Sequence, residues 1–546
     1  MDNLRFVLFV FLIFLSVMLW QQWQIDYGPK PETAPPSPAA EAPSTAKPDL
    51  PESAHGLDEP PVRPSAATAP HQRITVTTDV VRLEIDSEGG DLRQLDLLRY
   101  PVSKDHPEQP VRLFEDAPHL FVAQSGFLGD EASAPTHHSP WRAEATEYTL
   151  AEGQDTLTVP LTWSNDQGIR IVKTYTLRRG SYDIRVEHRV SNRANGVWKA
   201  RQYVQLQRKE PDEKDKNQLV RTYTGGVLYT PAEKYEKISF KDMAGENLAR
   251  KSKDGWIAMI QHYFVAAWIP PAGEEHSFYT KALPDNHFVI GAYSPYLEVG
   301  PNEEKTFTAQ LFAGPKLLRV LEKTAPGLDL TVDYGSLTII AKPVFWLLEQ
   351  FHKIFNNWGW AIIFVTITLK LLFYRLSAAS YRSMANMRKL QPKLAELKER
   401  YGSDKQRLNM AMMDMYRKEK VNPLGGCLPI LVQIPVFISL YWVLVESVEM
   451  RQAPFLLWLN DLSSKDPYFI LPLIMGVSMF IQQKLSPPPS DPMQAKVMQF
   501  FPIMFTGFFA FFPSGLVLYW VVNNLLSILQ QWYINRTIGR PTPAKA

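Results

Sequence analysis

The sequence predicts a polytopic α-helical membrane protein with six spans, of which five form a core with a hydrophilic groove, plus a large outer β-sandwich domain. Three observations indicate this fold class. Apolar segments long enough to cross a bilayer occur at the N-terminus and in the last third of the 546-residue chain. Residues 73–335 alternate apolar and polar side chains, as half-buried antiparallel strands do. Polar side chains also recur inside several apolar segments, which favours a groove over a dry helix bundle.

The composition excludes several classes of protein. The chain has 58 Lys and Arg against 56 Asp and Glu, a formal net charge of +2, which argues against a chain-wide basic surface for nucleic acid. Its one cysteine, Cys427, excludes an intramolecular disulfide and a multi-cysteine zinc or iron–sulfur site, so we expect it only to pack. The mean hydropathy of −0.18 would suit a soluble protein, because polar segments offset the apolar ones.

The N-terminal segment, residues 1–25, is predicted to be an uncleaved transmembrane anchor. Its run FVLFVFLIFLSVMLW ends in aromatic and amide residues that fit a membrane interface and no small-residue cleavage site. Residues 26–72 are rich in Pro, Ala, Glu and Ser and cannot bury a core. We therefore expect them to form an extended tether.

The β-domain is predicted from repeated period-2 segments. RITVTTDVVRLEID, IRIVKTYTLRR and YDIRVEHRVS alternate apolar and polar residues, and Gly89-Gly90 marks a turn between strands. This pattern over residues 73–335 predicts one large β-sandwich. His137 and His138 are expected to be a solvated loop pair rather than a metal site.

The last part of the chain is predicted to be helical. Residues 336–357 form an amphipathic pattern after Pro343, which indicates an interfacial helix; a helix packed on the β-domain is the alternative. The short link Pro513-Ser514-Gly515 predicts a tight antiparallel hairpin of the last two spans. The core spans are expected at 358–376, 423–449, 468–485, 497–512 and 515–534, joined by a helical hairpin (377–422), loops at 450–467 and 486–496, and a tail (535–546).

The orientation follows from the charges of the short loops. Residues 375–420 contain twelve basic and five acidic residues, a net charge of +7, whereas residues 446–466 contain two basic and four acidic residues. Because loops rich in Lys and Arg stay in the cytoplasm, the first loop is expected inside and the second outside. Both termini are then cytoplasmic, and the β-domain lies on the outer side.

The common signatures of enzymes are missing from the sequence. It contains no GxxxxGK[ST] phosphate loop, no HExxH, no GxSxG and no GxGxxG. We therefore expect no enzyme activity, no catalytic residue, no metal and no cofactor.

Lys370 lies inside a predicted span. A lysine near the centre of a bilayer costs about 2.5–3.5 kcal/mol, so it normally faces a partner or water. Thr366 lies four residues before it on the same helix face. Polar side chains of other spans accompany them, and the whole candidate set is Lys370, Thr366, Gln433, Asn523, Asn524, Ser527 and Gln530. We interpret this set as a water-filled groove; the alternatives are a snorkelling lysine and interhelical hydrogen bonds.

The cytoplasmic loop is predicted to be a two-helix hairpin. Apolar residues recur at spacings of three and four from Met387 to Tyr401, and Asp404 is a candidate N-cap for a second helix. Its basic exterior suits contact with ribosomal RNA or anionic lipid. The basic residues are Arg388, Lys389, Lys393, Lys398, Arg400, Lys405 and Arg407.

Four segments resemble a known family. NPLGGCLPILVQIPVF, VEMRQAPFLLWLNDLS, SDPMQAKVMQFFP and FPSGLVLYWVVNNLLSILQQ are similar to the YidC/Oxa/Alb family of membrane protein insertases, and the similarity extends over essentially the whole chain. The resemblance implies a bacterial inner-membrane insertase and chaperone with a periplasmic β-domain. It implies insertion without ATP, alone or with the Sec translocon, through a groove open to the cytoplasm.

The resemblance also implies roles for particular residues and partners. Lys370 matches the positive groove residue, where many relatives have Arg, and Ile434, Phe437, Tyr519 and Trp520 match positions that contact the client helix. The implied partners are nascent membrane proteins, the Sec translocon with its accessory subunits, the ribosome and anionic lipids. The alternatives are a transporter or channel that binds an anionic solute at Lys370, and an envelope scaffold with a polysaccharide-binding β-domain.

Overall fold

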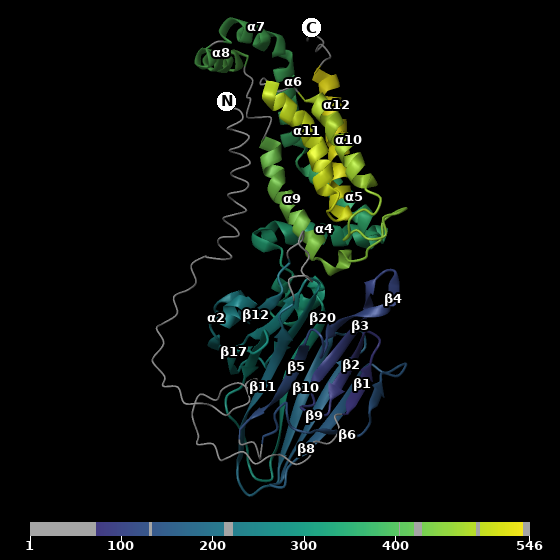
Figure 1. The fold of residues 1–546 in the computed structure, drawn as a ribbon, viewed down its shortest axis with the longest axis vertical. Helices are drawn as coiled ribbons and strands as arrows, with labels where there is room; N and C mark the ends of the chain where they lie inside the picture. Colours follow the sequence, from purple (N-terminus) through teal and green to yellow (C-terminus); the bar gives the residue numbers. More distant parts are fainter. Residues whose placement is uncertain are drawn as a thin grey trace, which may run out of the picture. The chain divides into compact units, whose positions relative to one another are not determined.

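The computed structural model describes residues 72–129, 134–211, 222–402, 404–419, 428–486 and 492–538. The predicted N-terminal anchor, nearly all of the tether, Cys427 and the end of the tail lie outside these residues. The chain divides into two compact units, one of β-strands up to Asp333 together with Glu446–Glu449, and one of helices from Tyr334 onward (Figure 1).

The β-unit contains two sheets, as the period-2 pattern predicts for a sandwich. Within the described residues all strand pairs are antiparallel except that of β1 with β7. The first sheet has eleven strands, in the order β14 (Ala249–Lys253), β17 (Glu275–Leu283), β18 (His287–Tyr293), β11 (Trp198–Lys209), β5 (Phe121–Leu128), β3 (Leu92–Ser103), β2 (Val81–Asp86), β1 (Arg73–Thr77) and β7 (Glu147–Thr149), with β19 (Leu297–Val299) beside β11 and β4 (His106–Phe114) beside β3.

The second sheet has nine strands among the described residues. Its strands β10 and β9 form a long antiparallel pair, in which Ile184 lies opposite Leu177. Short helical segments follow or interrupt the strands: α2 (Phe240–Gly245), α3 (Leu318–Thr324) and η2 (Leu328–Thr331). The strand order is β13 (Lys234–Ile238), β12 (Gly225–Thr230), β15 (Trp256–Gln261), β16 (Phe264–Ile269), β20 (Glu304–Pro315), β10 (Asp183–Asn192), β9 (Ile169–Arg178), β8 (Thr156–Ser164) and β6 (Arg142–Ala143).

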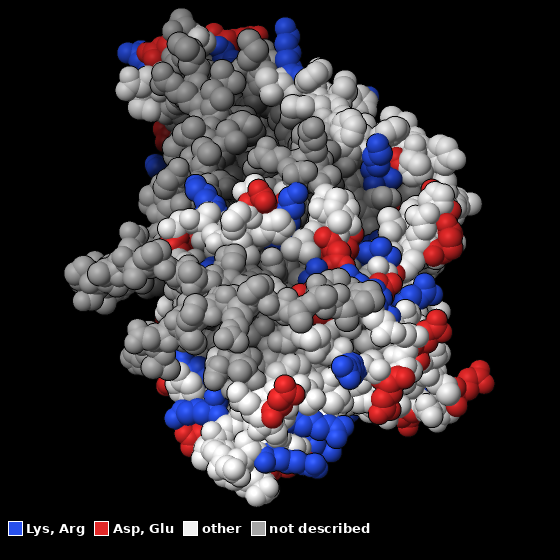
Figure 2. Space-filling view, turned by 60° about the horizontal axis from the view of Figure 1, so that its bottom comes forward, with Lys and Arg blue, Asp and Glu red and all other residues white. Residues whose placement is uncertain are grey.

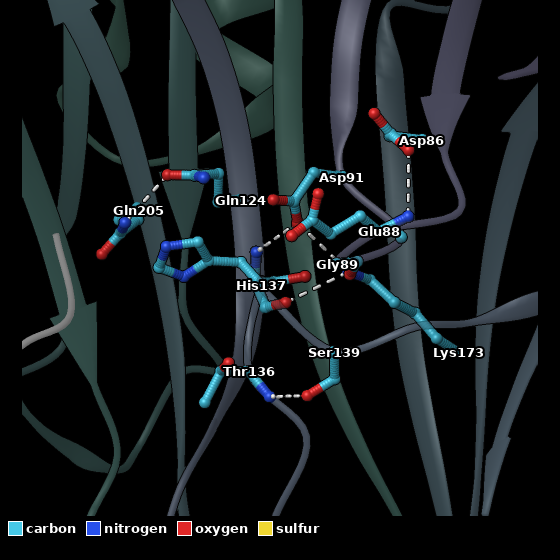
Figure 3. A network of polar contacts seen from close by, with 12 residues as sticks. Asp86, Glu88, Gly89, Asp91, Gln124, Thr136, His137, Ser139, Lys173 and Gln205 are labelled. Carbon is cyan, nitrogen blue, oxygen red and sulfur yellow. Dashed lines mark hydrogen bonds and ion pairs between the residues drawn. The ribbon is translucent and has the colours of Figure 1, made fainter. Parts of the chain in front are cut away.

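A buried ion pair connects the two sheets. Lys173 of β9 is fully buried, and its ammonium donates to the carbonyls of Gly89 and Ser125 at 3.0 and 3.1 Å and lies 3.7 Å from the Asp91 carboxylate (Figure 3). Gly89 has φ 76°, a left-handed conformation that turns its carbonyl toward the lysine. Burial lowers the pKa of Lys173 to about 8, although the Asp91 carboxylate opposes this shift. The ammonium thus stays charged at neutral pH and neutralises Asp91.

His137 corrects the sequence analysis. The side chain is only 3% exposed, and its Nδ1 lies 2.5 Å from the hydroxyl of Tyr203. Its ring contacts that of His138, with the centroids 4.2 Å apart. The predicted solvated pair was therefore wrong for His137, because Tyr203 of β11 supplies a buried polar partner that the local sequence does not reveal.

The surface carries charges of both signs, as the near-neutral composition predicts. On the face of the molecule in Figure 2, Lys and Arg side chains are interspersed with Asp and Glu. Neighbouring charges often pair, as Arg73 does with Asp116 at 2.6 Å and Lys199 with Glu298 at 2.8 Å. Exposed pairs of this kind contribute only about 0–1 kcal/mol each.

The helical unit begins with a short 3₁₀ turn and continues through nine α-helices in the described residues. Two of them, α5 and α6, are separated only by Phe373. The elements are η3 (Gly335–Leu337), α4 (Thr338–Phe355), α5 (Trp358–Leu372), α6 (Tyr374–Lys389), α7 (Gln391–Tyr401), α8 (Lys405–Lys418), α9 (Leu428–Glu446), α10 (Ile470–Leu485), α11 (Pro492–Phe509) and α12 (Ser514–Ile538), with η5 (Val448–Met450) after α9.

The amphipathic helix α4 begins earlier than its sequence suggests. It starts at Thr338, so Pro343 lies inside the helix and not in its first turn. The missing N–H of the proline leaves the carbonyl of Ile339 without its usual helical donor, and Ile339 is strongly exposed, where the solvent or interface can satisfy it. The rings of Phe351 and Phe355 pack on Phe364 of α5, with centroids 5.7 and 4.4 Å apart.

No single helix within the described residues combines the length and apolar composition that a membrane span needs, whereas α5 and α6 do so together across a bend of 67°. Val432–Glu446 and Ile470–Leu485 are shorter apolar helices.

The cytoplasmic hairpin predicted at 377–422 has its helices at α7 and α8. These two helices pack on each other, and the Lys393 ammonium lies 2.6 Å from the Glu419 carboxylate. Asp404 caps α8, because its carboxylate accepts hydrogen bonds from the backbone N–H groups of Gln406 and Arg407. The N-cap predicted from the sequence is therefore confirmed.

The last two helices do not form the predicted tight hairpin along their length. The helix α12 packs on α10, α5 and α6, and α11 packs mainly on α10, meeting α12 where the rings of Phe509 and Trp520 lie 6.0 Å apart. Gly476 of α10 permits the contact of α10 with α11, because a Cβ there would lie 2.1 Å from Oγ1 of Thr506 on α11. The missing side chain lets α10 and α11 approach closely.

We expect Gly476→Ala to weaken the contact between α10 and α11 by about 1–3 kcal/mol, because the added methyl group must displace Thr506. Gly507→Ala on α11 is the matched control, since its Cβ would meet no atom within 4 Å. Thermal unfolding of the full chain in detergent should show a lower midpoint for Gly476→Ala only. Equal midpoints for the two variants would contradict the close approach.

Candidate functional site

A small polar cavity lies among α5, α6, α9 and α12. Its volume is about 20 Å³, enough for one or two water molecules. Among the side chains that the structure describes, none from α10 or α11 lines it. The lining residues are Thr366, Leu369, Lys370, Phe373, Leu376, Ser377, Val432, Gln433, Val436, Tyr519 and Asn523.

Lys370 of α5 supplies the charge of this cavity. Its ammonium donates to the hydroxyl of Ser527 on α12 at 2.7 Å, and that hydroxyl donates to the carbonyl of Asn523 at 2.7 Å. In the part of the chain that the structure describes, no carboxylate lies within ion-pair distance of Lys370. The positive charge therefore has a neutral partner, which leaves its attraction for an anion uncompensated.

Amide and hydroxyl groups line the cavity together with Lys370. The Gln433 amide of α9 donates to Oδ1 of Asn523 at 2.6 Å and lies 3.5 Å from the hydroxyl of Tyr519. Thr366 is buried, and its hydroxyl donates to the carbonyl of Ile362 at 2.7 Å, as helix threonines commonly do. The structure thus brings Lys370, Thr366, Gln433, Asn523 and Ser527 together.

Two of the candidate groove residues lie elsewhere. The Asn524 amide donates to the hydroxyl of Ser478 on α10 at 3.1 Å, on a different face of α12 from Asn523. The Gln530 amide donates to the carbonyl of Tyr374 at 3.3 Å, beside the bend between α5 and α6. Asn524 therefore joins α12 to α10, which is the interhelical role that the sequence left open as an alternative.

An aromatic cluster lies next to the cavity. Phe437 of α9 packs on Tyr519 and Trp520 of α12, with ring centroids 6.1 and 5.0 Å apart. Ile434, one turn before Phe437, is 39% exposed. The four residues proposed to contact a client thus occur on two facing helices, with Ile434 accessible and the three rings packed together.

Ser377 is a cavity residue that the sequence analysis missed. It is buried and lies on α6, just beyond the bend, whereas Leu369 and Lys370 lie on α5 just before it. Ser377 follows Lys370 by seven residues, a spacing that places two residues on the same face of a helix. The sequence therefore contained the information needed to add Ser377 to the candidate set. Lys370 and Ser377 both line the cavity, although the bend at Phe373 lies between them.

The basic residues of the hairpin lie apart from the cavity, on α6, α7 and α8 or at their ends. Arg388 and Lys389 end α6, and Lys398 and Arg400 lie in the last turn of α7. Lys393 is paired with Glu419, and Arg407 lies 3.3 Å from Asp404. Lys405 begins α8.

Two protein families match this chain, and together the matches cover nearly all of the described residues. Residues 73–347 match the family described as the YidC periplasmic domain, and residues 350–541 match the family described as the 60Kd inner membrane protein. The boundary between the two matches lies within α4.

Individual proteins match over their full length. The chain is 67% identical over 544 residues to the membrane protein insertase YidC of Methylococcus capsulatus, covering 99% of both chains. It is 50% identical over 559 residues to the membrane protein insertase YidC of Thioalkalivibrio sulfidiphilus, again covering 99% of both. A solved structure of an active YidC insertase matches at 20% identity and a TM-score of 0.39, covering 85% of this chain and 93% of that one.

Proposed function

Because the chain belongs to the YidC family of membrane protein insertases, we propose that the polar cavity around Lys370 receives the polar tail of an entering client segment. The family is one of inner-membrane proteins with a periplasmic domain that act on nascent membrane proteins. The observation that carries the proposal is the ammonium of Lys370, which is held between helices by the neutral hydroxyl of Ser527.

A carboxylate on a client tail can take the place of Ser527 as the partner of Lys370. The bond to Ser527 leaves the ammonium without a counter-charge, whereas a carboxylate adds the attraction of two opposite charges to the hydrogen bond, so the exchange favours the arriving acid. The amides of Gln433 and Asn523 then offer donors and acceptors to the backbone of the tail. The polar groups of the protein thus replace water around the tail over part of its path into the membrane.

The energetics of insertion require no fuel under this proposal. A client span of about 20 residues gains roughly 0.3–0.6 kcal/mol for each strongly apolar residue that enters lipid. The obstacle is the desolvation of its polar tail, which costs several kcal/mol for unpaired groups. The groups around Lys370 lower that cost. Because the cavity has room for only one or two water molecules, we propose that its walls separate when a client enters.

The proposed orientation in the membrane rests on the charges of the loops between the spans. We propose six spans with both termini in the cytoplasm, since α6, α7 and α8 carry most of the basic residues of the loop with a net charge of +7. The hairpin then lies on the side where ribosomes, anionic lipid and the Sec translocon meet a new chain.

Neutralising Lys398, Arg400 and Arg407 together should weaken co-sedimentation of the full chain with ribosomes severalfold at low salt, because such contacts are electrostatic. The wild type should lose the same binding as the salt concentration rises. Binding that does not change with either the charges or the salt would contradict a charge-based contact.

Site-specific photo-crosslinking tests the proposed path. A crosslinker at Gln433, beside the cavity, should react with the tail and the first turns of a nascent client. Leu473 on α10 is the matched control, because it is 60% exposed and apolar but does not line the cavity. Equal yields from the two positions would contradict insertion through the cavity.

A further inference from the structure

A second, larger cavity lies within the β-unit and has no role in the proposed insertion path. Its volume is about 230 Å³, more than the roughly 150 Å³ of an engineered cavity that accepts benzene. It is formed where the ends of β4, β11 and β15 meet the start of β5. The lining residues are Arg112, Leu113, Glu115, His119, Phe121, Arg208, Pro211 and Gln261.

Arg208 of β11 is the unusual residue of this cavity. It is 8% exposed, its Nη2 donates to Oε1 of Gln261 at 2.6 Å, and its guanidinium carbon lies 4.6 Å from the ring centroid of Phe121. Its Nη1 is buried and has no hydrogen-bond partner among the residues that the structure describes. A buried donor without an acceptor is costly, which indicates that the group is held in place for a ligand.

The charge of Arg208 is also uncompensated. Burial lowers the pKa of Arg208 to about 10, against the influence of Glu115, so the guanidinium stays positive at neutral pH. Glu115 is the acidic group that acts on its pKa, yet the described residues contain no ion pair between the two. Arg112, the other arginine of the cavity, is already neutralised by Asp96 at 2.8 Å. Among the described residues, the cavity therefore offers one positive charge without an ion-pair partner, that of Arg208.

We propose that this cavity binds a small monocarboxylate with an apolar body. The carboxylate pairs with the positive charge of the Arg208 guanidinium, and the body packs against Phe121 and Leu113. A single negative charge fits better than a phosphate dianion, because only one guanidinium is uncompensated and Glu115 repels further negative charge. The ligand is either a free small acid or the carboxyl terminus of a peptide, since both present the same group.

Ligand-observed fluorine NMR on the full chain in nanodiscs tests this proposal, with 4-fluorobenzoate as the probe. We expect saturable binding of 4-fluorobenzoate, at least tenfold weaker binding of 4-fluorobenzamide, and little competition by inorganic phosphate. Competition by N-acetylphenylalanine as strong as that by benzoate would identify a peptide carboxyl terminus as the source, and weaker competition a free acid.

Two variants connect the binding to Arg208. Arg208→Met should reduce the affinity for 4-fluorobenzoate at least tenfold, and Glu115→Gln should raise it about threefold by removing the repulsive charge. Glu115 is only partly buried, so this second variant keeps the proposal testable if Arg208→Met fails to fold. No saturable binding, equal binding of the benzamide, or an affinity that Glu115→Gln leaves unchanged would overturn the proposal.

Discussion

The Lys370→Glu variant is expected to insert a client with an acidic tail at least about tenfold more slowly than the wild type. The substitution replaces the attraction of the ammonium for the acidic tail by repulsion. Placing like charges together costs several kcal/mol, while 1.4 kcal/mol already corresponds to a factor of ten. The measurement is the rate of insertion of such a client into vesicles that contain the purified full chain, followed by protection of its tail from protease.

Three controls separate charge from structure in this experiment. Lys370→Arg should retain most of the rate, because it keeps the charge next to Ser527. A client with a neutral tail should be affected much less by Lys370→Glu than one with an acidic tail. The folding of the variant is checked by its resistance to limited proteolysis. Normal insertion of the acidic-tailed client by folded Lys370→Glu would exclude Lys370 as the working charge.

The Lys173→Met variant is expected to destabilise the β-unit by about 3–5 kcal/mol. Removing the ammonium leaves the Asp91 carboxylate buried without its counter-charge, and the carbonyls of Gly89 and Ser125 without their donor. Burial already raises the pKa of Asp91, with Lys173 as the strongest opposing influence. Hydrogen exchange of the β9 and β3 amides in the full chain measures the change, because exchange from these central strands reports opening of the unit.

The double variant Lys173→Met with Asp91→Asn is the control for this interpretation. Since no unpaired charge remains, it should recover at least half of the stability that the single variant loses. Both residues are distant from the helical cavity in the sequence and belong to the other compact unit, so the client specificity should not change. A double variant as unstable as the single one would show that packing, and not charge, explains the effect.

The β-unit shows what periodicity can predict. The alternation in β9 places Ile171, Lys173 and Tyr175 on one face, and all three are buried in the structure. The sequence therefore predicts the sandwich and even the face on which Lys173 lies. It does not predict the partner, because Asp91 follows a glycine turn more than eighty residues earlier and the pairing depends on how two sheets stack.

The candidate site shows where the same reasoning needed one more step. Tyr519, Asn523 and Ser527 recur every four residues, so they share the face of α12 that meets Lys370. Asn524 is rotated by about 100° from Asn523 and belongs to the face toward α10. Sorting the polar residues of α12 by face would have separated the two groups from sequence alone.

Other features carried no usable local signal. The bend at Phe373 has neither a proline nor a glycine, which are the usual causes of sharp kinks. The burial of His137 depends on Tyr203, which lies on a distant strand. In the same way, the cavity at Arg208 depends on four strand ends that meet only after folding, and the sequence of β11 alone does not distinguish Arg208 from an exposed arginine.

The bend at Phe373 has a mechanical consequence. Phe373 is the C-cap of α5 and the N-cap of α6. A rotation about its two backbone angles therefore changes the angle between α5 and α6. Leu369 and Lys370 lie on α5, and Leu376 and Ser377 lie on α6. All four residues line the cavity. Because α7 begins two residues after the end of α6, we expect a displacement of the hairpin to change the distance between these two walls.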